Sequence, residues 1–225
     1  MSAGKMSSKW SQITKNAVER YNSRYEKLGK DVKSLGWGDK KQQIYRFEQA
    51  LSNVNLINKN ILDIGCGFSD FLSYIQEKNI MFSKYTGWDI NEKFLSENKI
   101  LENHFVTFEN QDISNLQESN LAELKKANHQ VLLMLGLLNF RLSEGERNYE
   151  YSFDLIRNAF AITSETLIVD FLSSKLTPQY PKEEFVFYHD PSVILEFALS
   201  LTSNVVLKHD YAPIPQKEFM LFLYK

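Results

Sequence analysis

Cysteine, histidine and long apolar runs are all scarce in this chain of 225 residues. Its single cysteine, Cys66, excludes an internal disulfide and a zinc site built from several cysteines, and the four histidines do not follow the spacing of metal ligands. No run approaches the roughly eighteen consecutive apolar residues of a membrane-spanning helix, and the N-terminus lacks the apolar segment of a secretory signal. We therefore expect a soluble, cytoplasmic protein that contains no metal ion and does not bind the membrane.

An excess of charge of one sign is also missing. The formal net charge is −2 at pH 7, which argues against a general nucleic-acid-binding protein. The charge is uneven, because residues 1 to 50 hold eleven Lys and Arg against five Asp and Glu, a balance of +6. Two interpretations follow: a solvated helical face, or an N-terminal cap that attracts an anionic small molecule.

The hydrophobic pattern changes from helical to strand-like near residue 55. Residues 10 to 28 have helical spacing, and Asp39 is well placed to begin a second helix that ends at Leu51. Apolar runs separated by helical patterns are typical of a parallel sheet; they lie at 60 to 65, 84 to 90, 104 to 110, 130 to 136 and 166 to 172. After a helix near 192 to 201, the runs 204 to 211 and 218 to 224 are too close for a crossover and should pair antiparallel. The sequence predicts an α/β fold with seven strands, the last one reversed, helices on both faces, and a helical cap in residues 1 to 54 before a domain in residues 55 to 225.

The stretch ILDIGCGFSD, residues 61 to 70, places a glycine-rich turn directly after the first predicted strand. Gly65 and Gly67 let a ligand approach the backbone at the carboxyl end of the sheet, where such folds bind ligands. A dinucleotide site would need glycine at position 70, where Asp70 would repel a pyrophosphate, and no GxxxxGK[ST] sequence is present. The carboxylates of Asp63 and Asp70 instead suit a cofactor with an ammonium and a sulfonium group, such as S-adenosylmethionine.

Two further carboxylates stand at or just past the carboxyl ends of the next two predicted strands. Asp89 in GWDI lies where a carboxylate can accept hydrogen bonds from both ribose hydroxyls, and Asp112 in NQDI is a suitable acceptor for an adenine amino group. Taken singly, these motifs have structural alternatives, namely an ordinary turn, a helix cap and a surface turn. Taken together, DIGCG, GWDI and NQDI resemble the motifs of class I S-adenosylmethionine-dependent methyltransferases, over residues 55 to 225.

This resemblance implies a Rossmann-like fold and gives roles to particular residues. The residues that it places around the cofactor are Asp63, Gly65 and Gly67 at the methionine portion, Asp89 at the ribose, Asp112 and Ile113 at the adenine, and Leu135 to Leu137 along the pocket. Cys66, Asp70 and Ile90 are further cofactor-binding candidates. Ser69 stands where the commonest family pattern has a third glycine, and Arg46 is expected at the cofactor's carboxylate or at the acceptor.

The turn after the fourth predicted strand narrows the choice of acceptor. Methyltransferases acting on amino nitrogens of DNA bases carry [DNS]PP[YF] there, and metal-dependent catechol-type enzymes carry an aspartate. This chain has LGLLNF, with Gly136 or Leu137 in place of that aspartate. We therefore expect a small-molecule acceptor, with neither nucleic acid nor magnesium. A neutral hydroxyl would need a base, for which His189, Tyr211 and Tyr21 are candidates. The alternative for His189 is a loop histidine held by its neighbours.

Residues 21 to 47 resemble the leader of methyltransferases from bacterial surface-polysaccharide gene clusters, as do EFVFYHDP and LKHDYAP. The resemblance implies O-methylation of a small anionic precursor of capsule or lipopolysaccharide, bearing a phosphate or phosphoramidate, or of a sugar. Aromatic rings and guanidinium groups suit such an anion. The candidate acceptor-binding residues are Tyr21, Arg24, Tyr25, Trp37, Asn139, His189 and Tyr211. The alternative function is a cofactor-binding protein that acts as a non-catalytic partner.

Overall fold

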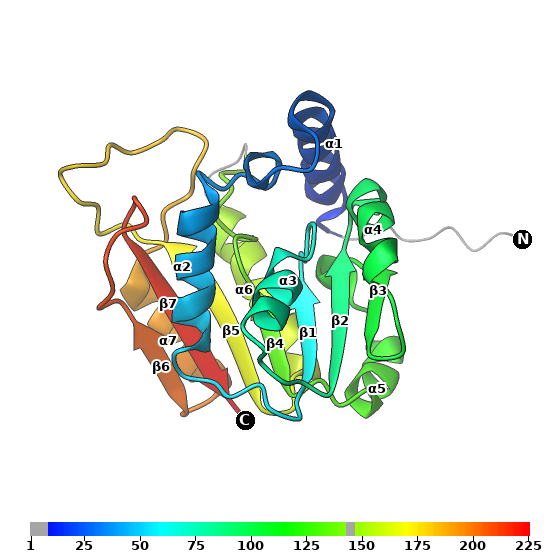
Figure 1. Cartoon of the computed structure of the whole chain (residues 1–225). Helices are drawn as coiled ribbons and strands as arrows, with labels where there is room; N and C mark the ends of the chain where they lie inside the picture. The colour runs from blue at the N-terminus through cyan, green and yellow to red at the C-terminus, as the bar shows by residue number, and fades with distance from the viewer. Residues whose placement is uncertain (1–8, 143–146) are drawn as a thin grey trace, which may run out of the picture.

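The computed structural model describes residues 9–142 and 147–225 and contains a seven-stranded sheet in the order β3-β2-β1-β4-β5-β7-β6 (Figure 1). The strands are β1 (Asn60–Ile64), β2 (Lys84–Asp89), β3 (Val106–Asn110), β4 (Val131–Met134), β5 (Thr166–Leu172), β6 (Val205–Lys208) and β7 (Glu218–Tyr224). β7 is antiparallel to both β5 and β6, and the other pairs are parallel. All seven predicted strands and the reversed last strand are confirmed.

Helices cover both faces of the sheet, as predicted. They are α1 (Ser11–Leu28), α2 (Lys40–Leu51), α3 (Asp70–Glu77), α4 (Glu92–Asn98), α5 (Glu118–Lys126), α6 (Asn148–Ile162) and α7 (Pro191–Leu201), with short 3₁₀ turns η1 (Val32–Leu35), η2 (Lys99–Leu101) and η3 (Ile113–Asn115). The Asp39 carboxylate accepts a hydrogen bond from the backbone N–H of Gln42, which confirms the expected cap of α2. α2 and α3 lie on one face, and α6 and α7 lie on the other (Figure 1).

The central strand β4 shows why its sequence, VLLM, is continuously apolar. All four residues are buried, and they alternate between the two cores. Leu132 and Met134 pack with α6 and α7, whereas Val131 and Leu133 pack with α2 and α3. A strand covered on both faces must be apolar at every position, and each such side chain stabilises the fold by about 1.5 to 3 kcal/mol.

None of the helices in the described part of the chain is long and apolar enough to cross a membrane.

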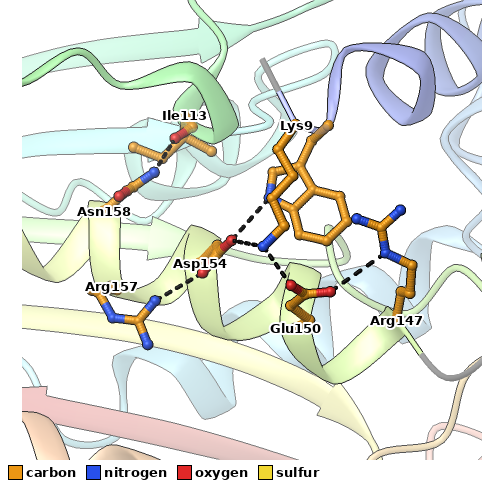
Figure 2. Close-up of polar contacts among 8 residues, drawn as sticks. Lys9, Ile113, Arg147, Glu150, Asp154, Arg157 and Asn158 are labelled. Carbon is orange, nitrogen blue, oxygen red and sulfur yellow. Dashed lines mark hydrogen bonds and ion pairs between the residues drawn. The ribbon is translucent and has the colours of Figure 1, made fainter.

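α1 lies outside these layers, above the carboxyl ends of β1 and β2 (Figure 1). None of its residues is buried, but Trp10, which precedes it, is only 1% exposed. The Trp10 indole donates a 3.1 Å hydrogen bond to Asp154 of α6, its ring meets Tyr151 edge-on, and the Arg147 guanidinium lies 4.6 Å from the ring centre. The preceding residue, Lys9, pairs with Glu150 and Asp154 of the same helix (Figure 2). Trp10 therefore anchors the N-terminal end of α1 to α6.

The expected N-terminal segment, residues 1 to 54, has two structural roles. α1 and η1 lie above the carboxyl ends of the strands (Figure 1). α2 instead belongs to the helical layer that covers one face of the sheet, and its residues Phe47 and Ala50 pack in the hydrophobic core beneath that layer. The first eight residues of the segment lie outside the described part of the chain.

Candidate functional site

A pocket lies between α1 and the carboxyl ends of β1, β2 and β4. Because β1, β2 and β3 are neighbours in the sheet, the residues at their carboxyl ends lie close together although they are far apart in sequence. Asp63, Asp89 and Asp112 all line this pocket. Of the thirteen residues predicted around the cofactor, twelve line it: Asp63, Gly65, Cys66, Gly67, Asp70, Asp89, Ile90, Asp112, Ile113, Leu135, Gly136 and Leu137.

The glycine turn after β1 leaves little room for a side chain at Gly65 or Gly67. The amides of Gly65 and Cys66 donate to the carbonyl of Trp88 at 2.7 and 3.0 Å, which ties the turn to β2. Gly67 has φ 54°, and a β-carbon at this position would lie 3.0 Å from the Leu35 side chain of η1. Ser69, which replaces the third glycine of the family pattern, adopts the left-handed φ of 59° that a glycine would adopt readily. The backbone can therefore approach a ligand closely here.

Asp63 and Asp89 are buried carboxyl groups that line the pocket. Burial raises the pKa of Asp63 to about 7, although a 2.6 Å hydrogen bond from the Tyr85 hydroxyl opposes this. Burial raises the pKa of Asp89 to about 6, while the amides of Asn91 and Gly67, both at 2.8 Å, favour its ionised form. A cationic or hydrogen-bonding ligand stabilises the ionised form of carboxyl groups whose pKa values are raised by burial.

Asp112 forms the opposite side of the pocket, after β3. Its two oxygens accept hydrogen bonds from the Ser114 amide at 2.9 Å and from the Thr14 hydroxyl of α1 at 3.0 Å. Each carboxylate oxygen has a second lone pair, so Asp112 retains capacity for an adenine amino group. The apolar side chains of Ile90 and Ile113 also line the pocket.

This set of groups fits S-adenosylmethionine. Carboxylates suit its ammonium, sulfonium, ribose and adenine amino groups, and the glycine turn accepts a closely packed ligand, while apolar side chains suit the adenine ring. Asp70 is already paired, because Lys40 and Gln43 contact it at 2.7 and 2.9 Å. Within residues 9–142 and 147–225, no group of three or more His, Cys, Asp or Glu side chains is arranged to hold a metal ion.

Comparisons with known proteins rest on structure alone, because no protein-family model and no curated protein sequence matches the chain. The structure of DhpI in complex with SAH aligns over 93% of this chain and 95% of its own, with a TM-score of 0.63 and 9% identity. The chain has the fold of S-adenosylmethionine-dependent methyltransferases. One such enzyme from Archaeoglobus fulgidus aligns over 84% of this chain and 95% of its own, at TM-score 0.56 and 14% identity. The small RNA methyltransferase HEN1 aligns over 81% of this chain but 25% of its own, at TM-score 0.61 and 14% identity.

The predicted acceptor-binding residues divide into two groups. Tyr21 and Trp37 line the pocket, whereas Arg24 and Tyr25 do not. The Tyr25 hydroxyl donates to Glu97 at 2.6 Å, and the Arg24 guanidinium lies against Gly36. Asn139 is also absent from the lining; its side-chain oxygen accepts the Leu172 amide at 2.8 Å and thereby holds the turn after β4 to the end of β5.

His189 and Tyr211 lie in the protein interior instead of in the pocket. His189 is fully buried, with its Nε2 atom 3.0 Å from the Ser152 hydroxyl, and burial lowers its pKa to about 3. Tyr211 is also buried, and its ring meets Tyr45 edge-on. The structure thus agrees with the alternative for His189, a histidine held by its neighbours, and neither side chain reaches the pocket lining.

Arg46 differs most from its expected place. It is 6% exposed, and its Nε atom donates to Glu218 at 2.7 Å and lies 3.2 Å from Asp170. Both carboxylates come from strands beside α2, so the guanidinium is used within the protein and does not line the pocket. The pairing joins residues 172 positions apart, which the sequence alone does not indicate.

Sequence reasoning missed several residues that line the pocket. They are Ile13, Thr14, Ala17, Arg20, Leu35, Gln43, Phe47, Ile64, Phe71, Phe94, Gln111, Leu138, Phe140, Leu142, Tyr151 and Leu155. A signal for the first four was present, because Ile13, Ala17 and Tyr21 form one stripe of α1 and Arg20 adjoins it. Arg20 is the only cationic side chain among the described residues of the lining. Its guanidinium carbon lies 3.8 Å from the centre of the Phe140 ring.

Proposed function

We propose that this protein is an S-adenosylmethionine-dependent methyltransferase that acts in the cytoplasm on a small anionic acceptor. The observation that carries the proposal is the convergence of Asp63, Asp89 and Asp112 with a glycine turn in one pocket of a methyltransferase fold. Asp89 holds the ribose, Asp112 the adenine amino group and Asp63 the cationic methionine portion. The cofactor supplies a methyl group already activated by its sulfonium.

Arg20 supports an anionic acceptor. Its guanidinium is partly desolvated by the pocket, burial lowers its pKa with Arg24 adding to the effect, and no carboxylate of the described residues pairs with it. A desolvated guanidinium without a counter-ion favours a ligand that brings one, and its planar fork matches a phosphate or a carboxylate. Phosphate- or phosphoramidate-bearing molecules and sugar derivatives, such as precursors of bacterial capsule or lipopolysaccharide, have this chemistry.

The titratable groups of the pocket also favour an acceptor oxygen that is already anionic. Among the described lining residues there is no histidine or lysine, and the carboxyl groups of Asp63 and Asp89 are assigned to the cofactor. Burial raises the pKa of Tyr21, which keeps its hydroxyl protonated at neutral pH. An oxyanion needs no base, so the protein has only to align it with the methyl group and exclude water. O-methylation by alignment is therefore the proposed mechanism.

Transfer of tritium from methyl-labelled cofactor tests this function. The acceptor panel contains small phosphates, phosphoramidates, carboxylates and sugars, with short RNA as a separate arm because HEN1 shares the fold. We expect label in one of the small anions. Cofactor binding without transfer to any arm would favour the non-catalytic alternative, and transfer to RNA alone would contradict the small-molecule acceptor.

A further inference from the structure

A buried charge cluster lies behind one wall of the pocket. The Arg46 guanidinium faces two fully buried carboxylates, Glu218 at 2.7 Å and Asp170 at 3.2 Å. Burial raises the pKa of Asp170, and the charge of Arg46 opposes this rise. Buried ion clusters seldom stabilise a fold more than apolar side chains of the same volume would. The Arg46 cluster is therefore better explained by a role in fixing the geometry around it than by a contribution to stability.

Both ends of the cluster contact the pocket wall. The Arg46 guanidinium lies 4.2 Å from the centre of the Trp37 ring, and Asp170 accepts a 2.5 Å hydrogen bond from the Gly136 amide. Trp37 and Gly136 line the pocket and touch each other, since a β-carbon on Gly136 would lie 2.9 Å from the Trp37 ring. The cluster therefore sets the position of both halves of one wall.

This wall stands at the glycine-turn end of the pocket. Leu137, next to Gly136, packs against Gly65, where a β-carbon would lie 2.9 Å from it. Asp112 and Thr14 lie at the other side, because β2 and β1 separate β3 from β4 in the sheet. The Trp37 wall thus faces the ligand portion bound at the glycine turn, away from the adenine.

We propose that Arg46 and Asp170 are positioning residues that fix the Trp37 wall against the amino-acid portion of the cofactor. The inference rests on the proposed function, because it takes S-adenosylmethionine as the ligand. The guanidinium, pinned by two carboxylates, holds the indole ring by a cation–π contact, and Asp170 holds the turn that the ring covers. Together they fix the direction of the sulfur substituents relative to the acceptor.

Two cofactor fragments separate this role from a general effect on folding. S-adenosylhomocysteine (SAH) carries the amino-acid portion, whereas 5′-methylthioadenosine has the same adenosine and sulfur without it. Arg46→Lys keeps the charge but loses the planar fork, so we expect SAH to bind roughly tenfold more weakly and methylthioadenosine to bind as in the parent. Trp37→Leu, which leaves the buried charges intact, should give the same split even if Arg46→Lys does not fold.

A double-mutant cycle and a matched control complete the experiment. If Arg46 acts through Trp37, Arg46→Lys should add little in the Trp37→Leu background. Lys59→Met breaks the 2.6 Å pair with Glu165, near the amino ends of the strands, and should change neither affinity. Equal weakening of both ligands, an unchanged SAH affinity, or additive effects would overturn the inference. A parent protein that binds neither ligand would instead refute the proposed function.

Discussion

The Thr14 hydroxyl of α1 donates a 3.0 Å hydrogen bond to Asp112, the carboxylate that follows β3. This bond links the helix over the pocket to the residue assigned to the adenine. Farther along α1, Asn22 accepts from Asn91 at 3.1 Å and Tyr25 donates to Glu97 at 2.6 Å. Since α1 buries none of its own residues, its position depends on these contacts, on the Trp10 anchor and on the ligand that fills the pocket below it.

We expect SAH to slow amide hydrogen exchange throughout α1, because the ligand supplies the apolar surface that the inner stripe of the helix lacks. Thr14→Val keeps the shape but removes the bond to Asp112, at a cost of about 0.5 to 1.5 kcal/mol, and should speed exchange in α1 of the free protein. Hydrogen-exchange mass spectrometry measures both effects. Unchanged exchange in α1 at saturating SAH, with the glycine turn protected, would show that the helix does not close on the cofactor.

Trp10 should be essential for the position of α1. Trp10→Ala removes the hydrogen bond to Asp154 and a buried ring, and substitutions of this type cost about 3 to 5 kcal/mol when the site cannot collapse. Urea denaturation measures the loss. The matched variant Trp10→Phe keeps a ring against Tyr151 and loses only the indole N–H, so it should cost much less. Equal stabilities of Trp10→Ala and the parent would contradict the anchor.

Stability without ligand should fall as the pH rises from about 4 to about 7. Burial raises the pKa values of Asp63 to about 7 and of Asp89 to about 6, from 3.8. In this range the folded protein holds protons that the unfolded chain has released, so the free energy of unfolding decreases with pH. Denaturation at a series of pH values measures the slope, and Asp89→Asn should reduce it.

Cofactor binding should become stronger as the pH rises through this window, because Asp63 and Asp89 then lose their protons. The ligand's ammonium and ribose groups favour ionised carboxylates, so the affinity for SAH should increase up to about pH 7 and level off above it. Calorimetric titrations at several pH values test this. An affinity that does not change between pH 5 and 8 would contradict the assigned contacts of Asp63 and Asp89.

Arg20, rather than Arg24, should recognise the acceptor's anion. With the SAH complex and inorganic phosphate as the probe, Arg20→Ala should weaken phosphate binding roughly tenfold or more, as expected for loss of a charge-assisted contact. Arg24→Ala is the matched control, since Arg24 lies on the same helix but outside the lining, and should leave binding unchanged. Phosphate-31 NMR titration distinguishes them. If Arg20→Ala instead weakens SAH but not methylthioadenosine, Arg20 binds the cofactor's carboxylate and the acceptor assignment is wrong.

The sequence predicts the fold and the acidic half of the pocket well, for physical reasons. Strands buried on both faces are apolar at nearly every position, and the spacing between such runs reveals the crossover helices. Asp63, Asp89 and Asp112 were identifiable because each lies at the carboxyl end of a strand or just beyond it, and the carboxyl ends of parallel strands lie side by side. No long-range information is needed for either step.

The acceptor side of the pocket could not be predicted in the same way, because it depends on contacts between distant segments. Arg46 pairs with Glu218 because β7 lies beside α2, and His189 is buried against α6 and the rings of Phe171 and Phe187. Local sequence gives the chemistry of these side chains but not the direction in which they point. Arg20 adjoins a recognisable helical stripe, yet its place over Phe140 depends on how α1 crosses the sheet.

Calorimetric titration of SAH into the parent protein and into Asp89→Ala tests the central claim most directly. Asp89 is 8% exposed and is assigned to the ribose hydroxyls, so its removal loses charge-assisted hydrogen bonds. We expect micromolar binding to the parent and a loss of about 1.5 to 3 kcal/mol in the variant, roughly ten- to a hundredfold in affinity. A parent protein that does not bind SAH, or an Asp89→Ala variant that binds it as tightly as the parent, would contradict the account.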